Sequence, residues 1–147
     1  MYDFSEVAIA AQRVQSLAWQ EDHLIDWAGR HVIFHSNGTS ERVYTSYGRC
    51  FDSAAVSPSG ECAVIYERLG TKGLIIRNGQ LLREINRSYY CSDVYEYPVA
   101  LFALPDGREV IAHCPDEYCK IEIEELISGK RLTQRANKPQ DFFHSRN

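Results

Sequence analysis

The stretch FDSAAVSPSGECAVIY, residues 51–66, decides the fold of this chain. Two runs rich in apolar residues, Phe51 to Val56 and Cys62 to Tyr66, flank the sequence Ser57-Pro58-Ser59-Gly60. Proline presets the backbone angle φ for a tight turn, and glycine accepts the positive φ that often closes one. The stretch therefore predicts two antiparallel strands joined by a tight turn.

The residues that follow extend this pair to four strands. Leu74 to Arg77 is a predicted third strand and Gln80 to Ile85 a fourth, with Asn78-Gly79 between them. Asn-Gly tolerates the two positive φ values that a type I′ hairpin turn requires. Residues 51–85 are therefore predicted to form one four-stranded antiparallel unit.

The same order of strands and turns occurs before this unit, over residues 14–45. Asn37-Gly38 predicts another type I′ hairpin, with its glycine 41 residues before the glycine of Asn78-Gly79. The predicted strands of this first unit are Val14 to Trp19, His23 to Trp27, His31 to His35 and Thr39 to Thr45.

The order occurs once more over residues 99–132. Pro105-Asp106-Gly107 follows Pro58-Ser59-Gly60 at an offset of 47 residues. In the last predicted strand apolar and polar residues alternate, as in a half-exposed outer strand. The predicted strands are Val99 to Leu104, Val110 to His113 and Cys119 to Glu124, followed by a hairpin turn at Ser128-Gly129-Lys130.

Tandem units of about 40 to 50 residues with four strands each are the sequence signature of propeller blades. We therefore predict an all-β fold in which residues 1–147 form a single domain of about three antiparallel four-stranded blades. The hairpins at Val56 to Tyr66 and Leu101 to Ala112 resemble blade cores of WD-repeat-like β-propellers, particularly bacterial ones. The resemblance spans Val14 to Leu132 and implies a scaffold that hosts binding platforms and several kinds of enzyme.

Two features depart from that family. No Trp-Asp dipeptide ends a unit and no Gly-His pair opens one. Closed propellers have about four to eight blades, so three units predict an incomplete or open propeller. An open stack leaves apolar faces and strand edges uncovered, so we expect either a homodimer that closes a six-bladed ring or an open monomer.

Both ends of the chain lie outside the repeats. Val7, Ile9 and Ala11 alternate within Glu6 to Arg13, which favours a strand donated to a neighbouring sheet over a single helical turn. At the other end, Asp141 to Asn147 contains two aromatic residues but no further strand and turn.

Composition excludes several classes of function. The chain of 147 residues has a formal net charge of -4 and no basic stripe, so nucleic acid is not an expected partner. Acids near the N-terminus and the absence of an apolar run of about 18 residues argue against a secretory signal and a membrane span, and predict a cytoplasmic protein. The five cysteines are odd in number and scattered, which predicts reduced, mostly buried thiols.

The segment between the second and third units is the strongest candidate for a binding site, because it contains four tyrosines. Tyrosine and arginine are enriched among the residues that dominate protein–protein binding energies. The alternative is that these rings pack between adjacent sheets and set their spacing. The candidate binding residues are Arg87, Tyr89, Tyr90, Asp93, Tyr95, Glu96 and Tyr97, together with Asp116, Glu117 and Tyr118 from the third unit.

Other clusters support less specific chemistry. Cys114 and Cys119 with His113 have metal-ligand side chains, but no second pair completes a zinc site, so we expect neither a metal nor another cofactor. Glu122, Glu124 and Glu125 predict an acidic strand edge, which either receives a basic partner or prevents edge-to-edge pairing.

Catalysis has little support in the sequence. No nucleophile elbow, phosphate-binding glycine loop or HExxH motif is present, and His23, His31 and His35 are expected to be structural or surface residues. We therefore expect a non-enzymatic protein-interaction module whose partner is another protein. A toxin-neutralising immunity protein and a propeller-type hydrolase are the alternatives.

Overall fold

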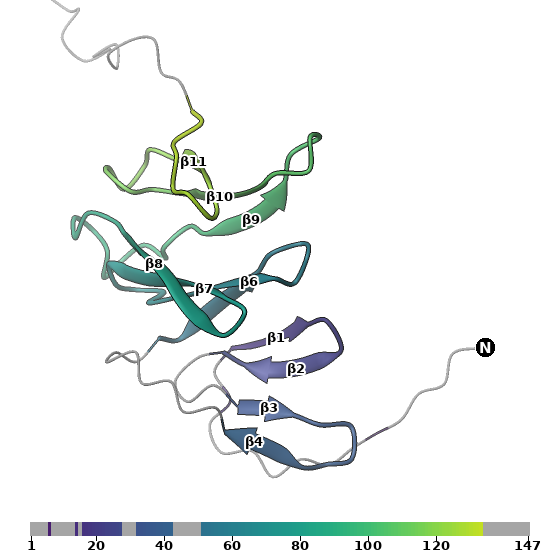
Figure 1. Cartoon of the computed structure of the whole chain (residues 1–147). Helices are drawn as coiled ribbons and strands as arrows, with labels where there is room; N and C mark the ends of the chain where they lie inside the picture. The colour runs from purple at the N-terminus through teal and green to yellow at the C-terminus, as the bar shows by residue number, and fades with distance from the viewer. Residues whose placement is uncertain (1–5, 7–13, 15, 28–31, 43–50, 134–147) are drawn as a thin grey trace, which may run out of the picture.

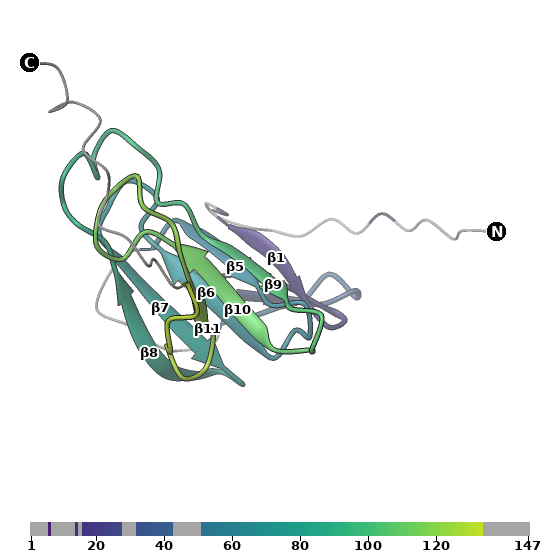
Figure 2. The same ribbon diagram turned by 90° about the horizontal axis from the view of Figure 1, so that it is seen from above.

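A computed structural model describes residues 6, 14, 16–27, 32–42 and 51–133, and every structural statement below refers to these residues. They form an all-β structure of three antiparallel sheets that follow one another along the molecule (Figures 1 and 2). Within the described residues, no helix is long and apolar enough to cross a membrane. The segments Glu6 to Arg13 and Asp141 to Asn147 lie almost entirely outside the described residues.

Each sheet is built from strands that are consecutive in the sequence. The first sheet has the order β1-β2-β3-β4, the second β5-β6-β7-β8 and the third β9-β10-β11. Their bounds are β1 Leu17–Gln20, β2 His23–Asp26, β3 Val32–Phe34, β4 Ser40–Arg42, β5 Ser53–Val56, β6 Cys62–Tyr66, β7 Lys72–Arg77, β8 Gln80–Asn86, β9 Ala100–Ala103, β10 Glu109–His113 and β11 Glu122–Glu125.

The predicted hairpins are present, but one turn differs in type. Asn78 and Gly79 both have positive φ, at 49° and 76°, as a type I′ turn requires. At the first hairpin only Gly38 has positive φ, because three residues separate His35 from Thr39 and the Gly38 amide donates to the His35 carbonyl. This geometry is that of a type I turn closed by a left-handed glycine, so the type I′ prediction was wrong at this position.

The third sheet has three strands, where a four-stranded unit was predicted. Beyond β11 only one bridge forms, between Glu124 and Arg131, although the Leu132 amide also donates to the Ile123 carbonyl. The predicted strand from Cys119 also begins later, at Glu122. The pairing of a fourth strand therefore starts in the right place but does not extend through the described residues.

The sheets are arranged like neighbouring blades of a propeller. The first strand of each sheet lies beside the first strand of the next, so β1 contacts β5 and β5 contacts β9. Two polar contacts join the turns at one end of these strands: Gln20 Nε2 donates to the Gly60 carbonyl, and the Ser59 amide donates to Glu109 Oε1. The second sheet is thus held on both sides.

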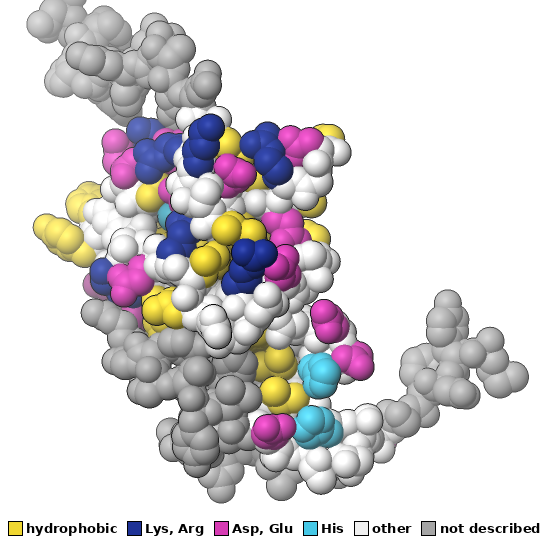
Figure 3. All heavy atoms as spheres, viewed as in Figure 1, with side chains coloured by type: hydrophobic (Ala, Val, Ile, Leu, Met, Phe, Trp, Pro, Cys, Tyr) yellow, Lys and Arg dark blue, Asp and Glu magenta, His cyan; other side chains and the backbone are white. Residues whose placement is uncertain are grey.

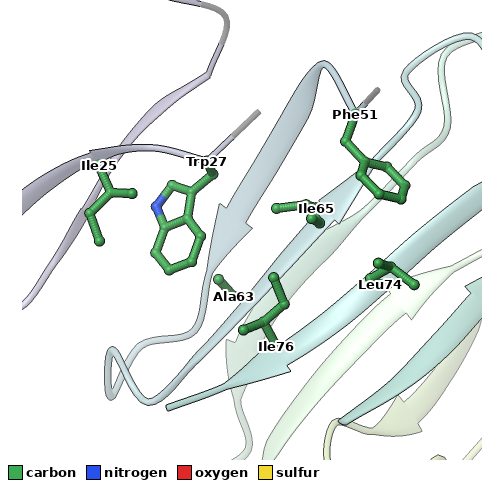
Figure 4. Close-up of a cluster of buried hydrophobic side chains, with 7 residues drawn as sticks. All are labelled: Ile25, Trp27, Phe51, Ala63, Ile65, Leu74 and Ile76. Atoms are coloured by element: carbon green, nitrogen blue, oxygen red, sulfur yellow. The ribbon is translucent and has the colours of Figure 1, made fainter. Parts of the chain in front are cut away.

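The first junction, between the first and second sheets, is apolar. Ile25 and Trp27 come from the first sheet and its following residue, and they face residues of the second sheet (Figure 4). The buried members of this cluster are Ile25, Trp27, Phe51, Ala63, Ile65, Leu74 and Ile76.

The second junction, between the second and third sheets, uses the opposite face of the second sheet. Side chains alternate between the faces of a strand, so Val64 and Ile75 point to the third sheet while their neighbours point to the first. The buried cluster comprises Cys62, Val64, Ile75, Ile85, Tyr97, Ile111 and Leu126. Charged side chains also enter this junction, and they lie beneath the candidate binding residues.

Candidate protein-binding surface

Arg87 anchors the tyrosine-rich segment that connects β8 to β9. Its Nε atom donates to the Gly70 carbonyl at 2.6 Å and its Nη2 atom to the Ser92 carbonyl at 2.9 Å. Its guanidinium also lies over the Tyr97 ring, 4.9 Å from the centroid, which is cation–π geometry. Burial lowers the pKa of Arg87, but a guanidinium normally titrates so high that it stays charged. Arg87 therefore binds backbone carbonyls of its own chain rather than facing solvent.

Tyr97 lies in the second junction and is almost fully buried. Its ring packs edge-on against Tyr66, and its hydroxyl lies 3.0 Å from Nδ1 of His113. Burial raises the pKa of Tyr97, so the hydroxyl keeps its proton. In this position the hydroxyl satisfies Nδ1 of His113, a polar atom of a buried side chain.

Glu124 lies on the other side of His113. The two side chains approach within 3.2 Å between Nε2 and Oε2, close enough for an ion pair but without the alignment of a hydrogen bond. The Arg83 Nη1 atom donates to the same carboxylate oxygen at 3.3 Å. Burial alone would raise the pKa of Glu124, but the contacts with His113 and Arg83 outweigh it and hold the pKa below its usual value. The carboxylate therefore stays charged in the interior because it is paired.

The strand registers explain why these side chains meet. Arg83 pairs with Ile75, and Glu124 pairs with Ile111, so both charged residues share a sheet face with an isoleucine of the second junction. His113 is two residues after Ile111 and points the same way. Tyr97, His113 and Glu124 are buried, and together with the partly buried Arg83 they form a continuous set of contacts, which we call the polar chain.

The predicted acidic edge was wrong for two of its three members. Glu122 and Glu124 are 2% and 7% exposed, whereas only Glu125 is half-buried. Glu122 accepts a hydrogen bond from Thr133 and lies 3.7 Å from the Lys120 ammonium. The β11 alternation places both carboxylates on the face that meets the second sheet, so they are interior groups with partners.

Three tyrosine rings from the two loops that adjoin Tyr97 and His113 meet at the surface. Tyr95 stacks on Tyr118 with centroids 6.0 Å apart and an interplanar angle of 16°, and Tyr90 lies 5.3 Å from Tyr118 at 48°. Tyr90, Tyr95 and Tyr118 are nevertheless 60%, 57% and 43% exposed. We call these three residues the tyrosine patch. It unites the segment after β8 with the loop between β10 and β11, two segments that are separate in the sequence.

Tyr89 and Val94 extend the exposed apolar surface beside the patch, at 84% and 66% exposure. On the face shown in Figure 3, hydrophobic side chains project at the left edge, at the level of the loop that follows β8 in Figure 1. The same view shows Lys and Arg side chains intermingled with Asp and Glu, without a separate basic area.

Four exposed carboxylates belong to the same two loops. Glu96 lies 3.5 Å from Arg68, and Asp116 pairs with Arg131 at 2.8 Å. Asp93 and Glu117 have no ion-pair partner in the described part of the chain. The surface around the tyrosine patch therefore includes two negative charges that are not paired with another described residue.

The structure thus divides the candidate binding residues into two groups. Eight are exposed: Tyr89, Tyr90, Asp93, Tyr95, Glu96, Asp116, Glu117 and Tyr118. Arg87 and Tyr97 are buried and hold the first loop in place. Sequence reasoning missed the polar chain, although one signal was present: Glu122 and Glu124 alternate in step with the apolar Leu126, which marks a core-facing series.

The described cysteines and histidines do not gather into a metal-binding cluster. Among described residues, no group of three or more His, Cys, Asp or Glu side chains is arranged to hold a metal ion. Cys62 and Cys114 are buried, Cys91 is half-buried and Cys119 is exposed, so two of the four described cysteines have the predicted burial, and Cys50 lies outside the described residues. The His23 side chain is exposed, and its Nδ1 atom lies 2.9 Å from Oδ1 of Asp22. The ring of His35 contacts the ring of His23 edge-on.

Comparison with known proteins yields only distant likeness. No model of a protein family matches the sequence, and no curated protein matches it. Solved structures similar to this chain include Hsv2 from Kluyveromyces lactis, at 15% identity and a TM-score of 0.48 over 76% of this chain and 36% of Hsv2. Hsv2 from Kluyveromyces marxianus is similar at 13% identity and a TM-score of 0.48, over 84% of this chain and 37% of that one. The chain spans just over a third of the length of these two structures.

Proposed function

We propose that the protein is a non-enzymatic interaction module that binds another protein through the tyrosine patch and its exposed neighbours. The observation that carries this proposal is that three tyrosine rings from two separate loops are in contact and still largely exposed. Tyrosine combines a large apolar ring with a polar hydroxyl. It therefore suits a surface that is exposed to water in the free protein and excludes water in the complex.

The support beneath the patch favours binding. Arg87 fixes the first loop through two backbone carbonyls, and Arg131 holds the second through Asp116. Loops that are already ordered lose less conformational entropy on association, so more of the contact energy contributes to affinity. The rings are thus presented in a fixed arrangement before a partner arrives.

The interior histidine argues for a structural rather than a catalytic role. A general acid or base has to reach the reacting group of a substrate, directly or through one water. His113 and Tyr97 are each 2% exposed and are enclosed between two sheets. This enclosure supports assigning the polar chain to fold stability.

Site-specific photo-cross-linking tests the proposal. A photoreactive phenylalanine analogue replaces Tyr89, which is exposed and adjoins the patch, and the matched control replaces Leu81, an exposed residue of β8. We expect a discrete cross-linked protein from position 89 in the native cell, its loss in the Tyr90→Ser/Tyr95→Ser background, and no such product from position 81. Equal labelling from both positions, or labelling that survives the double substitution, would contradict the proposal.

A further inference from the structure

We propose that the tyrosine patch takes an arginine-bearing basic segment of the partner protein, an inference that rests on the function proposed above. The patch offers two features that a guanidinium can use together: exposed aromatic faces and uncompensated carboxylates. Each feature limits the chemistry of the occupant.

The packing of the rings decides how an occupant can approach. Centroids 5.3 Å and 6.0 Å apart place Tyr90 and Tyr95 in contact with Tyr118, so no side chain fits between the rings. An aromatic cage around a bulky quaternary ammonium would need separated rings. The three side chains are nevertheless 60%, 57% and 43% exposed, so part of the ring surface is open to a flat group that stacks on it.

The charges beside the rings favour a cationic occupant. Asp93 precedes Tyr95 by two residues, and Glu117 immediately precedes Tyr118. Neither carboxylate has an ion-pair partner among the described residues, whereas Glu96 and Asp116 are paired with Arg68 and Arg131. The one lysine of the second loop, Lys120, lies against the buried Glu122. A positive segment therefore meets two negative charges that no described residue of the protein neutralises.

Arginine fits this combination better than lysine. A guanidinium is planar, stacks on aromatic faces and donates two parallel hydrogen bonds to a carboxylate, whereas an ammonium is a compact and strongly hydrated point charge. The chain already makes this contact internally, since the Arg87 guanidinium lies 4.9 Å from the centroid of Tyr97. The exposed parts of the Tyr95 and Tyr118 rings offer aromatic surface of the same kind to a guanidinium from another chain.

Two fluorescently labelled peptides that differ only in their positively charged residue test the inference. One alternates arginine with serine and the other alternates lysine with serine, and fluorescence anisotropy measures their binding to the full chain at near-physiological salt. We expect the arginine peptide to bind at least about fivefold more tightly, which corresponds to roughly 1 kcal/mol of stacking energy at an exposed site. Tyr95→Ser/Tyr118→Ser should remove this preference.

Charge variants separate stacking from general attraction. Asp93→Asn/Glu117→Gln should weaken both peptides by a similar factor, while Glu84→Gln, which removes an exposed carboxylate on β8, should change neither. Equal affinity for the two peptides, or no binding of either up to about 1 mM, would overturn the inference.

The two proposals can fail separately. If tyrosine-dependent cross-linking at position 89 persists while the arginine peptide shows no preference, the surface binds a partner of different chemistry and only the present inference is lost. If the arginine peptide shows no preference and cross-linking at position 89 is also absent, or is unchanged by Tyr90→Ser/Tyr95→Ser, both proposals are wrong.

Discussion

The two junctions between sheets are built from the same repeated unit, yet they differ in polarity. Ile25, Ile65 and Ile76 meet in an apolar cluster at the first junction. A hydrogen bond from Gln20 to the Gly60 carbonyl also joins the two sheets, near the turns. The second junction has a comparable apolar cluster but also contains the Glu124 carboxylate, which contacts His113 and Arg83.

The difference coincides with the position of the tyrosine patch. Arg87 begins the first tyrosine loop and Tyr97 ends it, and the two side chains are in contact at one end of the polar chain. His113, another member of the polar chain, directly precedes the second loop. The hydrophobic effect is not directional, whereas buried charged groups lose much of their stabilisation when their partners move. We infer that the first junction mainly stabilises the stack, and that the second also fixes the positions of the two loops.

The largest expected effect is at the apolar junction. Ile65→Ala removes a fully buried side chain and should lower the free energy of unfolding by about 4 kcal/mol, since truncation leaves a cavity in close packing. Urea unfolding at neutral and mildly acidic pH measures it, with Leu81→Ala as the exposed control. A similar loss at both pH values is predicted, and a loss below about 1 kcal/mol would show that this junction is not tightly packed.

A smaller but pH-dependent effect is expected at the polar junction. Glu124→Gln leaves Arg83 and His113 without a charged acceptor and should cost about 2 to 3 kcal/mol at neutral pH. The exposed Glu84→Gln is the matched control, and it should change stability by less than about 0.5 kcal/mol.

The sign of the pH dependence follows from the lowered pKa of Glu124. A carboxylate with a depressed folded-state pKa stabilises the protein fully above its unfolded-state pKa, and this contribution is lost as the pH falls through the folded-state pKa. The gap in stability between wild type and Glu124→Gln should therefore narrow below the ordinary glutamate pKa of about 4.3. A gap that stays constant with falling pH would exclude a charged, paired Glu124.

Much of the fold could be predicted because its signals are local. Pro58, Gly60 and the Asn78-Gly79 pair are turn residues whose backbone preferences act at short range, and they marked the hairpins of the second sheet correctly. The turn at Gly38 was placed correctly but assigned the wrong type, because Asn-Gly also fits a three-residue loop.

The polar chain could not be predicted with the same rules. Charged residues in an alternating strand usually face solvent, so Glu122 and Glu124 were assigned to an exposed edge. The charge of the buried Glu124 is paired with Arg83, which comes from a different sheet, and with His113, which comes from a different strand. Contacts between residues about 40 positions apart, such as Arg83 with Glu124, leave no local pattern in a single sequence.

Composition predicts the two loops as a binding region, but it does not predict which of their tyrosines are buried and which are exposed. Tyr97 and Tyr95 differ by two positions in the sequence, yet one is buried and the other is exposed. Tyr97 lies beside the Arg87 guanidinium, whose hydrogen bonds to the Gly70 and Ser92 carbonyls come from contacts that composition does not reveal.

Oxidative coupling of tyrosines tests the central claim most directly, namely that the buried anchors hold the two tyrosine loops in contact. Light-driven oxidation with a ruthenium complex and persulfate joins neighbouring exposed tyrosines, and mass spectrometry of the digested protein identifies the linked peptides. The account predicts an intrachain link from Tyr90 or Tyr95 to Tyr118 in the folded protein, and a reduced yield in Arg87→Lys, which keeps the charge but not the planar fork. Absence of this link in the folded wild-type protein, or an equal yield in urea, would contradict it.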